Sequence, residues 1–426
     1  MQKLVQIFKN QGLRKKILFT IAIIVAYRFL AQISIPGIDL VALKSIFEQN
    51  EYLSLFSLLT GGSAENFSIV LMGLGPYINA SIIIQLLTVI WPKLEEMSKE
   101  GETGRKKLNA ITRWLTLPLA FLQSYGTILL LNSQMPIISN ISDPSVILPI
   151  MLTVSAGSVL IMWLGEIMTE NGIGNGISLL ILVSIISTVP TALAQNLIVA
   201  SSDINQLIPV VSVVLFTLAL IVATVIVTDA SREIPVAYGS KTKKASVSSL
   251  PIKVNQAGMI PIIFAVSVVT LPTIVAQLIS GSSSSTLVAI SEFVLANFGM
   301  NQPLYILTLF LLILGFTYFY VNITFDTEKV AENMQKRGGY IPGIRPGKNT
   351  ADYLRQVSDR LNLFGGLFIA LIAVLPIIFQ NLIGTTGNQL PLLISGAGIL
   401  IIVGVILDLK RQVEANLISD NYNNLI

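Results

Sequence analysis

The segment LIPVVSVVLFTLALIVATVIVT occupies residues 207–228 and is an unbroken apolar run without a single charged side chain. About 20 residues of α-helix cross the roughly 30 Å hydrocarbon core of a lipid bilayer. A helix also satisfies its backbone hydrogen bonds internally, which lipid demands of any segment that crosses it. Residues 207–228 therefore predict a membrane-spanning helix and make this chain an integral membrane protein.

Similar apolar runs recur along the whole chain. The first run contains Arg28, lacks a small-residue cleavage site and is followed by further runs, so it predicts a retained span and not a signal peptide. We predict ten membrane-spanning helices in an all-α bundle, at Ile17–Ile35, Ile69–Trp91, Trp114–Leu131, Val146–Leu164, Gly174–Ile198, Leu207–Thr228, Ala257–Ile279, Leu304–Ile323, Leu363–Leu382 and Leu390–Leu407.

The composition excludes most enzyme classes. Hydrophobic residues make up 53% of the 426 residues and charged residues only 12%, whereas soluble domains carry about a quarter charged residues. Cys and His are both absent, which excludes disulfides, thiolate or imidazole metal sites and nucleophiles activated by His. We therefore expect no enzyme activity, no metal and no cofactor.

The basic residues alternate with the spans and define the predicted orientation. Five Lys and Arg precede the first span, six lie between spans two and three, five between six and seven, seven between eight and nine, and two follow the last. These 25 of the 27 basic residues share one side, while the other side holds Lys44. Because cytoplasmic loops carry the excess of Lys and Arg, both termini are predicted to be cytoplasmic.

The predicted spans contain a single ionisable residue, Arg28. Ion-coupled carriers usually keep ionisable side chains inside the bundle, so a secondary transporter or small-solute channel is the less favoured alternative to a passive conduit. A third alternative, an intramembrane enzyme, would need a Ser-Lys or Asp pair, and no predicted span contains Lys or Asp. Ten spans also divide into two sets of five, which allows an inverted repeat.

The outer segment between spans one and two is longer than a bundle needs. It contains the short apolar stretch Leu53–Leu59, followed by Thr60, Gly61 and Gly62. This stretch is too short to span and too apolar for an ordinary loop. It suits either a helix that folds back into the bundle or one that lies at the membrane interface.

Two basic loops, residues 229–255 and 326–362, are also long. The second contains the run Gly338–Gly347, which is dense in Gly and Pro. Pro fixes φ and Gly permits unusual φ, so this run predicts a rigid turn that presents Arg345. Ordered protrusions of this kind indicate a surface that a partner grips.

Five motifs then follow one another along the chain. They are GLGPYINASI at residues 73–82 with QLL at 85–87, GETGRKK at 101–107, WLGE at 163–166 with GIGNG at 172–176, LPIKVN at 250–255 and IPGIRPG at 341–347. In this order and within ten predicted spans, the chain resembles the SecY/Sec61 alpha family, the central subunit of protein-conducting channels. The resemblance runs from about Leu13 to Val413.

The resemblance implies ten transmembrane helices in two inverted five-helix halves, with a central hourglass pore and a short plug helix. It implies a passive channel that passes unfolded secretory polypeptides across the membrane and releases transmembrane segments laterally into lipid. SecA ATPase or the ribosome would supply the force. The expected parts are a cytoplasmic N-terminal segment at 1–16, an N-terminal half at 17–198, a C-terminal half at 199–409 and a cytoplasmic tail at 410–426.

The resemblance also assigns a seal and a plug. In the family, a ring of apolar side chains closes the waist of the pore, and the matching residues here are Leu74, Ile78, Ile177, Ile181, Ile263 and Ile401. Bulky apolar side chains seal by dewetting and offer a passing chain no hydrogen bonds. The plug matches residues 53–66, with Leu53, Phe56, Leu59, Gly61, Gly62 and Asn66 as its members.

A lateral gate and a docking surface follow from the same resemblance. Spans two, three, seven and eight resemble the gate, where Gln85 and Gln123 match polar positions. A bond between two amides in an apolar seam is worth about 1 kcal/mol, which an intercalating signal helix can break. Arg345, Lys243 and Lys244 match the loop residues that SecA and ribosomes contact.

The implied partners are those of the family. They are SecE, SecG and SecA, the ribosome, signal peptides and nascent or preprotein chains, SecDF and YidC, and membrane lipids. The implied location is the bacterial cell membrane, as a multi-pass protein, with the thylakoid membrane as the alternative.

Overall fold

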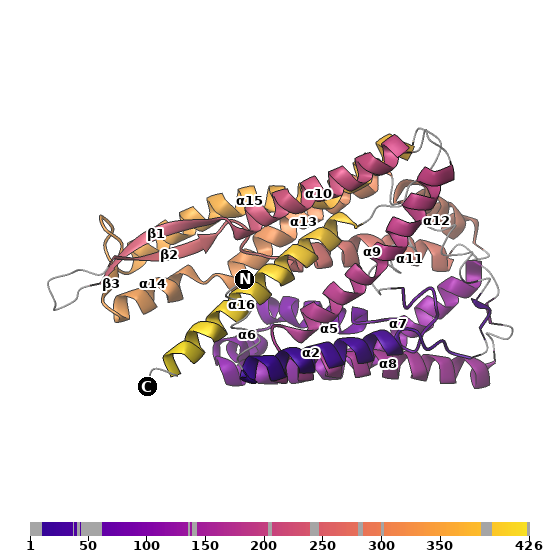
Figure 1. Cartoon of the computed structure of the whole chain (residues 1–426), viewed down its shortest axis with the longest axis horizontal. Coiled ribbons are helices and arrows are strands. Elements are labelled where there is room, and N and C mark those ends of the chain that lie inside the picture. The colour runs from indigo at the N-terminus through magenta and orange to yellow at the C-terminus, as the bar shows by residue number, and fades with distance from the viewer. Residues whose placement is uncertain are drawn as a thin grey trace. The chain divides into compact units, whose positions relative to one another are not determined.

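The structure is a computed structural model that describes residues 11–36, 38–40, 43, 62–134, 137–138, 143–202, 207–238, 247–279, 284–299, 302–384 and 394–423. Helices dominate it (Figure 1). They are α2 (Gln11–Leu30), α5 (Gly75–Ile90), α6 (Pro92–Lys99), α7 (Glu102–Gln134), α8 (Pro144–Asn171), α9 (Gly176–Ser202), α10 (Leu207–Asp229), α11 (Ile260–Ile279), α12 (Ser285–Asn297), α13 (Pro303–Thr324), α14 (Thr327–Lys336), α15 (Lys348–Gly384) and α16 (Gly396–Asn423). The strands are β1 (Ser231–Tyr238), β2 (Val247–Lys253) and β3 (Gly339–Tyr340).

Each of the ten predicted spans overlaps one of these helices. In the described part of the chain, five helical stretches are long and apolar enough to cross a membrane, and the bent pair α5–α6 makes a sixth. The helices α2 and α16 overlap the first and last predicted spans but also carry charged residues, Arg14 to Lys16 in α2 and Asp408 to Arg411 in α16. A helix that leaves the bilayer needs such polar turns at its end.

The side chains of α10 show what surrounds the spans. Ile208, Leu215, Val222 and Ile226 are 58–75% exposed and recur seven, seven and four residues apart. That spacing places them along one face of the helix. A continuous exposed apolar stripe is unstable in water and stable against lipid acyl chains. This face of α10 therefore faces lipid.

The three Trp residues of the chain mark a membrane boundary. Trp91 follows α5, Trp114 lies in the first half of α7 where the predicted third span begins, and Trp163 lies in the last third of α8 where the predicted fourth span ends. All three rings are exposed, by 58%, 78% and 56%. Trp is enriched where the hydrocarbon core meets the headgroups, because its ring is apolar and its N–H is polar. The positions fit one common interface at the ends of these spans.

The chain divides into two compact units. The first contains Met1–Ser202, Thr273–Ala296 and Val405–Ile426, and the second contains Asp203–Pro272 and Asn297–Gly404. The predicted first half, residues 17–198, falls within the first unit. The inverted relation between the halves stays a prediction.

In the first unit, neighbouring helices pack in sequence, with α5 against α7, α7 against α8 and α8 against α9, while α2 packs on α8 and α9. The chain turns by 101° between α5 and α6, at Trp91 and Pro92. Pro92 suits this corner because it begins α6, where its missing N–H costs nothing.

An apolar core in the first unit lies where the outer segment returns to the bundle. Phe67, Leu71 and Ile128 are at most 1% exposed within it. The backbone of Ile35 donates to the carbonyl of Phe67 at 3.0 Å, and Ile69 donates to Ile33 at 3.0 Å. These bonds join the end of α2 to the segment before α5 and satisfy backbone groups that have no helical partner.

The second unit contains a part that the span prediction missed. β1 pairs antiparallel with β2 along its length and with β3 at Ala237 and Tyr238. The sheet packs with α14 and the start of α15 around buried residues Ile234, Val236, Ile252, Met334, Ile341, Leu354 and Val357. We call β1, β2 and residues 326–361, which include α14, β3 and the loop with Arg345, the sheet module. It occupies the two loops that were predicted to be long and basic.

The spans of the second unit pack around α15, which contacts α13 and α10. The ring of Phe216 on α10 stacks on Phe379 of α15 with centroids 3.8 Å apart. The methyl group of Thr317 on α13 fits beside Gly366 of α15, where an added Cβ would lie 3.2 Å from it. Small residues allow this close approach, which replaces the hydrophobic effect as the source of helix association in lipid.

Candidate functional site

Two of the predicted ring residues lie on one turn at the start of α5. The N–H of Ile78 donates to the carbonyl of Leu74 at 3.0 Å, so the side chains stand one helical turn apart. Leu74 is 7% exposed and Ile78 is half-buried. Gly73 precedes them with φ of 51°, a left-handed conformation that Gly adopts without strain. The turn of the backbone at Gly73 places Leu74 at the N-cap of α5.

Two more ring residues, Ile177 and Ile181, lie on the first turns of α9. Ile177 is half-buried and Ile181 is 9% exposed. The residues that hold Ile177 belong to α8. A Cβ built on Gly165 would lie 2.9 Å from Cγ1 of Ile177, and one on Gly176 would lie 2.1 Å from the carbonyl oxygen of Gly165. Glycine at 176 permits this backbone contact, and a side chain at 165 would press on the side chain of Ile177.

Residues 172–175, the α8–α9 turn, are tied down by side-chain hydrogen bonds. Thr169 Oγ1 accepts from the N–H of Gly176 at 2.8 Å, and Asn175 Oδ1 accepts from the N–H of Ile177 at 3.1 Å. Thr20 of α2 accepts from the N–H of Ile173 at 3.2 Å. These bonds satisfy the free N–H groups at the start of α9. The turn is thereby connected to two neighbouring helices.

The remaining ring residues belong to the second unit. Ile263 lies on α11 and is half-buried, and Ile401 lies on α16 and is 2% exposed. The predicted ring thus has four members in one unit and two in the other. Its closure stays a prediction.

Most of the predicted plug lies outside the described residues. These members are Leu53, Phe56, Leu59 and Gly61. Gly62 has φ of 78°, which suits a glycine at a turn. The amide of Asn66 donates to Gln32 Oε1 at 3.3 Å, which ties the end of the predicted plug to the residues after α2.

The two predicted gate residues lie on neighbouring helices. Gln85 is on α5 and Gln123 is on α7, and these helices pack together. Both side chains are half-buried. In this structure the Gln85 amide donates to Ser81 Oγ of its own helix at 3.4 Å. A direct bond between Gln85 and Gln123 stays a prediction.

Of the predicted docking residues, Lys243 and Lys244 lie outside the described residues, and Arg345 is exposed. The backbone around Arg345 turns at its glycines, which fits the Gly and Pro content of the loop. Gly343 and Gly347 have φ of 84° and 96°, and the buried hydroxyl of Thr350 donates to the carbonyl of Arg345 at 3.0 Å. Arg345 therefore stands on a fixed backbone.

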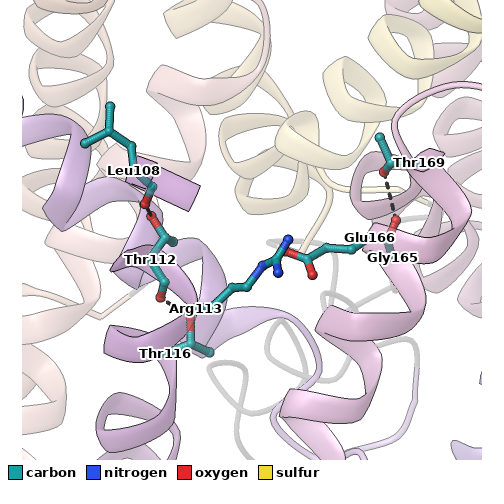
Figure 2. Close-up of polar contacts among 7 residues, drawn as sticks. All are labelled: Leu108, Thr112, Arg113, Thr116, Gly165, Glu166 and Thr169. Atoms are coloured by element: carbon teal, nitrogen blue, oxygen red, sulfur yellow. Dashed lines mark hydrogen bonds and ion pairs between the residues drawn. The ribbon is translucent and has the colours of Figure 1, made fainter. Parts of the chain in front are cut away.

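Sequence reasoning missed an ion pair between two spans. Nε of Arg113 on α7 donates to Oε1 of Glu166 on α8 at 2.6 Å. Figure 2 shows the guanidinium and the carboxylate meeting between the two helices. The sequence offered one signal, because both residues lie close to a Trp at the predicted ends of consecutive spans. Arg113 adjoins Trp114, and Glu166 follows Trp163 by three residues.

These observations define the class of protein first. A bundle of apolar helices with lipid-facing stripes, a boundary marked by Trp and a polar module joined to the spans is a multi-pass helical membrane protein. The SecY family model matches residues 68–410 of the chain. The chain belongs to the SecY family.

Curated relatives match over the full length. The SecY protein translocase subunit of Corynebacterium glutamicum is 40% identical over 444 residues, with 100% of each chain covered. That of Rickettsia typhi is 38% identical and covers 98% of this chain and 96% of its own.

The fold is similar to solved channel structures. A protein-conducting channel matches with a TM-score of 0.62 and 18% identity, over 95% of this chain and 93% of the other. Sec61 in a canine ribosome–channel complex from the endoplasmic reticulum matches with a TM-score of 0.59 and 18% identity, over 94% of this chain and 92% of the other. At this identity, these matches establish the fold alone. The prediction of a SecY-type bundle is confirmed.

Proposed function

We propose that this chain is the pore-forming subunit of a Sec translocon, and is not an enzyme. It is a passive channel that passes unfolded secretory polypeptides across the membrane and releases transmembrane segments into lipid. The observation that carries the proposal is the full-length similarity to protein translocase subunits, at 40% identity in the first of them. The nearly charge-free spans support it, because a conduit for polypeptides has no need to hold an ion inside the bundle.

The ring of Leu74, Ile78, Ile177, Ile181, Ile263 and Ile401 forms the seal in this proposal. Two pairs in the ring stand one turn apart on α5 and α9, so each helix presents a double layer of apolar side chains. A narrow apolar layer dewets and blocks ions, while branched aliphatic side chains can move apart around a passing chain. Residues 53–66 act as the plug, and Gln85 and Gln123 act at the lateral gate.

The sheet module serves as the docking surface in the same proposal. Its exposed Arg345 contacts SecA or the ribosome, together with Lys243 and Lys244. SecE, SecG and SecA are the expected protein partners, and SecDF and YidC assist. Signal peptides, preprotein chains and membrane lipids are the other contacts. The chain resides in the bacterial cell membrane with both termini in the cytoplasm, which the distribution of Lys and Arg supports.

Uptake of a preprotein into proteoliposomes tests the function directly. The full chain is reconstituted with SecE, and SecA and ATP are added outside with a signal-bearing preprotein or a signal-defective control. Protease-protected, signal-dependent preprotein is the expected result. Absence of protection with a SecA that is active on a known translocon, together with uptake of a small solute, would contradict the proposal in favour of a solute transporter.

The ring assignment has its own test. Replacing Ile78, Ile177 and Ile181 together by Gly removes three branched side chains from the seal, and we expect ion conductance in planar bilayers to rise. Leu117 and Leu122 on α7 are more than half exposed and provide the matched control when replaced by Gly. Equal conductance in the two variants would remove these residues from the seal.

A further inference from the structure

The Arg113–Glu166 ion pair has a setting unlike that of other ion pairs in the described chain. Lys106–Glu102 and Lys336–Glu332 each join residues four apart on one helix, and their side chains are 60–86% exposed. Such pairs contribute little to stability, because water screens both charges. Arg113 and Glu166 instead join α7 to α8, 53 residues apart in sequence, and the Glu166 side chain is 15% exposed while that of Arg113 is 49% exposed.

The pair lies on closely packed helix faces. Thr112 and Thr116 flank Arg113 on α7, are at most 5% exposed and donate their hydroxyls to carbonyls one turn earlier. On α8, Thr169 donates to the carbonyl of Gly165 at 2.8 Å. Figure 2 shows these local bonds on both sides of the ion pair. Because each helix satisfies its own polar groups here, the Arg113–Glu166 bond is the polar contact that crosses between them in this view.

The pair is also adjacent to the ring positions of the first unit. Gly165 precedes Glu166 and contacts Ile177 of α9. The helix α5, which carries the Leu74 and Ile78 positions at its start, packs on both α7 and α8. The ion pair therefore joins two helices that contact α5 and, through Gly165, the start of α9.

We propose that Arg113 and Glu166 are positioning residues that hold α7 against α8 and so keep the conduit closed to polypeptides without a functional signal. The inference rests on the proposed function, because it concerns how strictly that channel selects its substrates. The Ser124–Ser155 hydroxyl contact and helix packing also join α7 to α8, so loss of either charge loosens only the part of α7 that carries Arg113. It leaves the covered Glu166 carboxylate, or the Arg113 guanidinium, without its partner. A chain with this part of α7 loosened opens more readily.

The test measures uptake of a signal-defective preprotein in the reconstituted system with SecE and SecA. Glu166→Gln keeps the size of the side chain and Arg113→Gln shortens it, and both remove the charge. Each is expected to raise signal-defective uptake about fivefold, the effect of roughly 1 kcal/mol. The double variant Arg113→Glu with Glu166→Arg restores the pair with reversed charges and should return uptake toward the original level. Lys106→Gln, which removes an exposed charge from the same helix, should leave uptake unchanged.

Uptake of a signal-bearing preprotein by the unaltered chain separates the two proposals. If the unaltered chain fails to take it up, the proposed function fails, whatever the variants do. If it succeeds while both single variants reject the signal-defective preprotein as strictly as the original, the positioning role is overturned. The role is also overturned if the variants lower the thermal stability of the complex but leave signal selection unchanged, or if the charge-reversed double variant is less selective than both singles.

Discussion

The α8–α9 turn and the sheet module are both well ordered, but they are held by different means. The turn depends on backbone contact between Gly165 and Gly176 and on hydroxyl groups that satisfy free N–H groups. The sheet module depends on side chains that form a small apolar core, as in a soluble domain. The turn therefore has no volume to spare, whereas the module can lose one core residue and relax around it.

This difference fits the composition of each region. Residues 171–176 are three Gly, two Asn and one Ile, so the turn has little apolar side chain to bury, and close backbone approach and hydrogen bonds hold it together. The sheet module has many charged residues and an interior shielded from water, so the hydrophobic effect stabilises it. The chain is thus stabilised by backbone contact and hydrogen bonds in the turn and by hydrophobic burial in the sheet module. Substitutions in one region or the other distinguish the two.

The largest effect is expected at the turn. Gly176→Ala places a methyl group 2.1 Å from the carbonyl oxygen of Gly165, where only a backbone shift makes room. Overpacking of this kind costs about 3 kcal/mol, and the midpoint of thermal unfolding in detergent should fall. Gly126→Ala on α7, whose added Cβ meets nothing within 4 Å, is the control and should be neutral or stabilising. Equal unfolding midpoints for Gly176→Ala and Gly126→Ala would show that the turn, like the sheet module, can relax around a substitution.

A somewhat smaller, local effect is expected in the sheet module. Leu354 is 0% exposed in its core, and Leu354→Ala should cost about 2 kcal/mol, the low end for such a cavity, because the module can relax around it. Limited proteolysis should then cleave the module while the membrane spans stay protected. Gln356→Ala, on the exposed side of the same helix, should leave the cleavage pattern unchanged. Loss of the spans together with the module would mean that the two regions unfold as one.

A smaller effect is expected at the Arg345 loop. Thr350→Val keeps the shape of the side chain and removes the hydrogen bond to the carbonyl of Arg345, worth about 1 kcal/mol. SecA-dependent uptake should fall, though less than in Arg345→Ala, and Thr350→Ser should restore it. Uptake that Thr350→Val leaves unchanged would mean that the Gly and Pro residues alone hold the loop.

The smallest effect is expected at the start of α14. Asp326 accepts a hydrogen bond from the N–H of Lys329 at 3.1 Å, and this bond lowers the pKa of the carboxyl from its ordinary value of 3.8. The negative charge therefore stabilises α14 above pH 3.8, and the contribution is lost as the pH falls through the lowered pKa. Asp326→Asn should weaken the amide protection of α14 by about 0.5 kcal/mol at pH 7. The difference from the original chain should vanish in acid, and a difference that persists there would have another cause.

The membrane spans could be predicted from the sequence because the length of an apolar run is enough to identify each of them. An apolar run such as residues 207–228 becomes a helix in lipid whatever its neighbours are. The ring positions on α5 and α9 came from the resemblance carried by the motifs around Leu74 and Ile177, and their role stays a prediction. The turned backbone around Arg345 could be predicted because its Gly and Pro residues lie within ten residues of one another.

The features that escaped prediction depend on contacts between distant segments. The sheet module joins β1 and β2 to α14 and α15, and its clearest local signal is the alternation of Ile234 and Val236 in a short, polar stretch. The Arg113–Glu166 pair becomes visible once α7 and α8 are packed. Asp, Glu, Lys and Arg at span ends are so common that no spacing within the sequence singles out this pair.

The length of α15 has a mechanical consequence for the sheet module and the membrane span that it joins. It is one continuous helix of 37 residues, about 55 Å long, and its first turns belong to the sheet module while its later turns form a membrane span. The first proline within it is Pro376, so an unbroken ladder of hydrogen bonds stiffens roughly the first 42 Å. A push on the Arg345 loop, which adjoins the start of this helix, is thus carried into the bilayer as the tilt of a rigid rod.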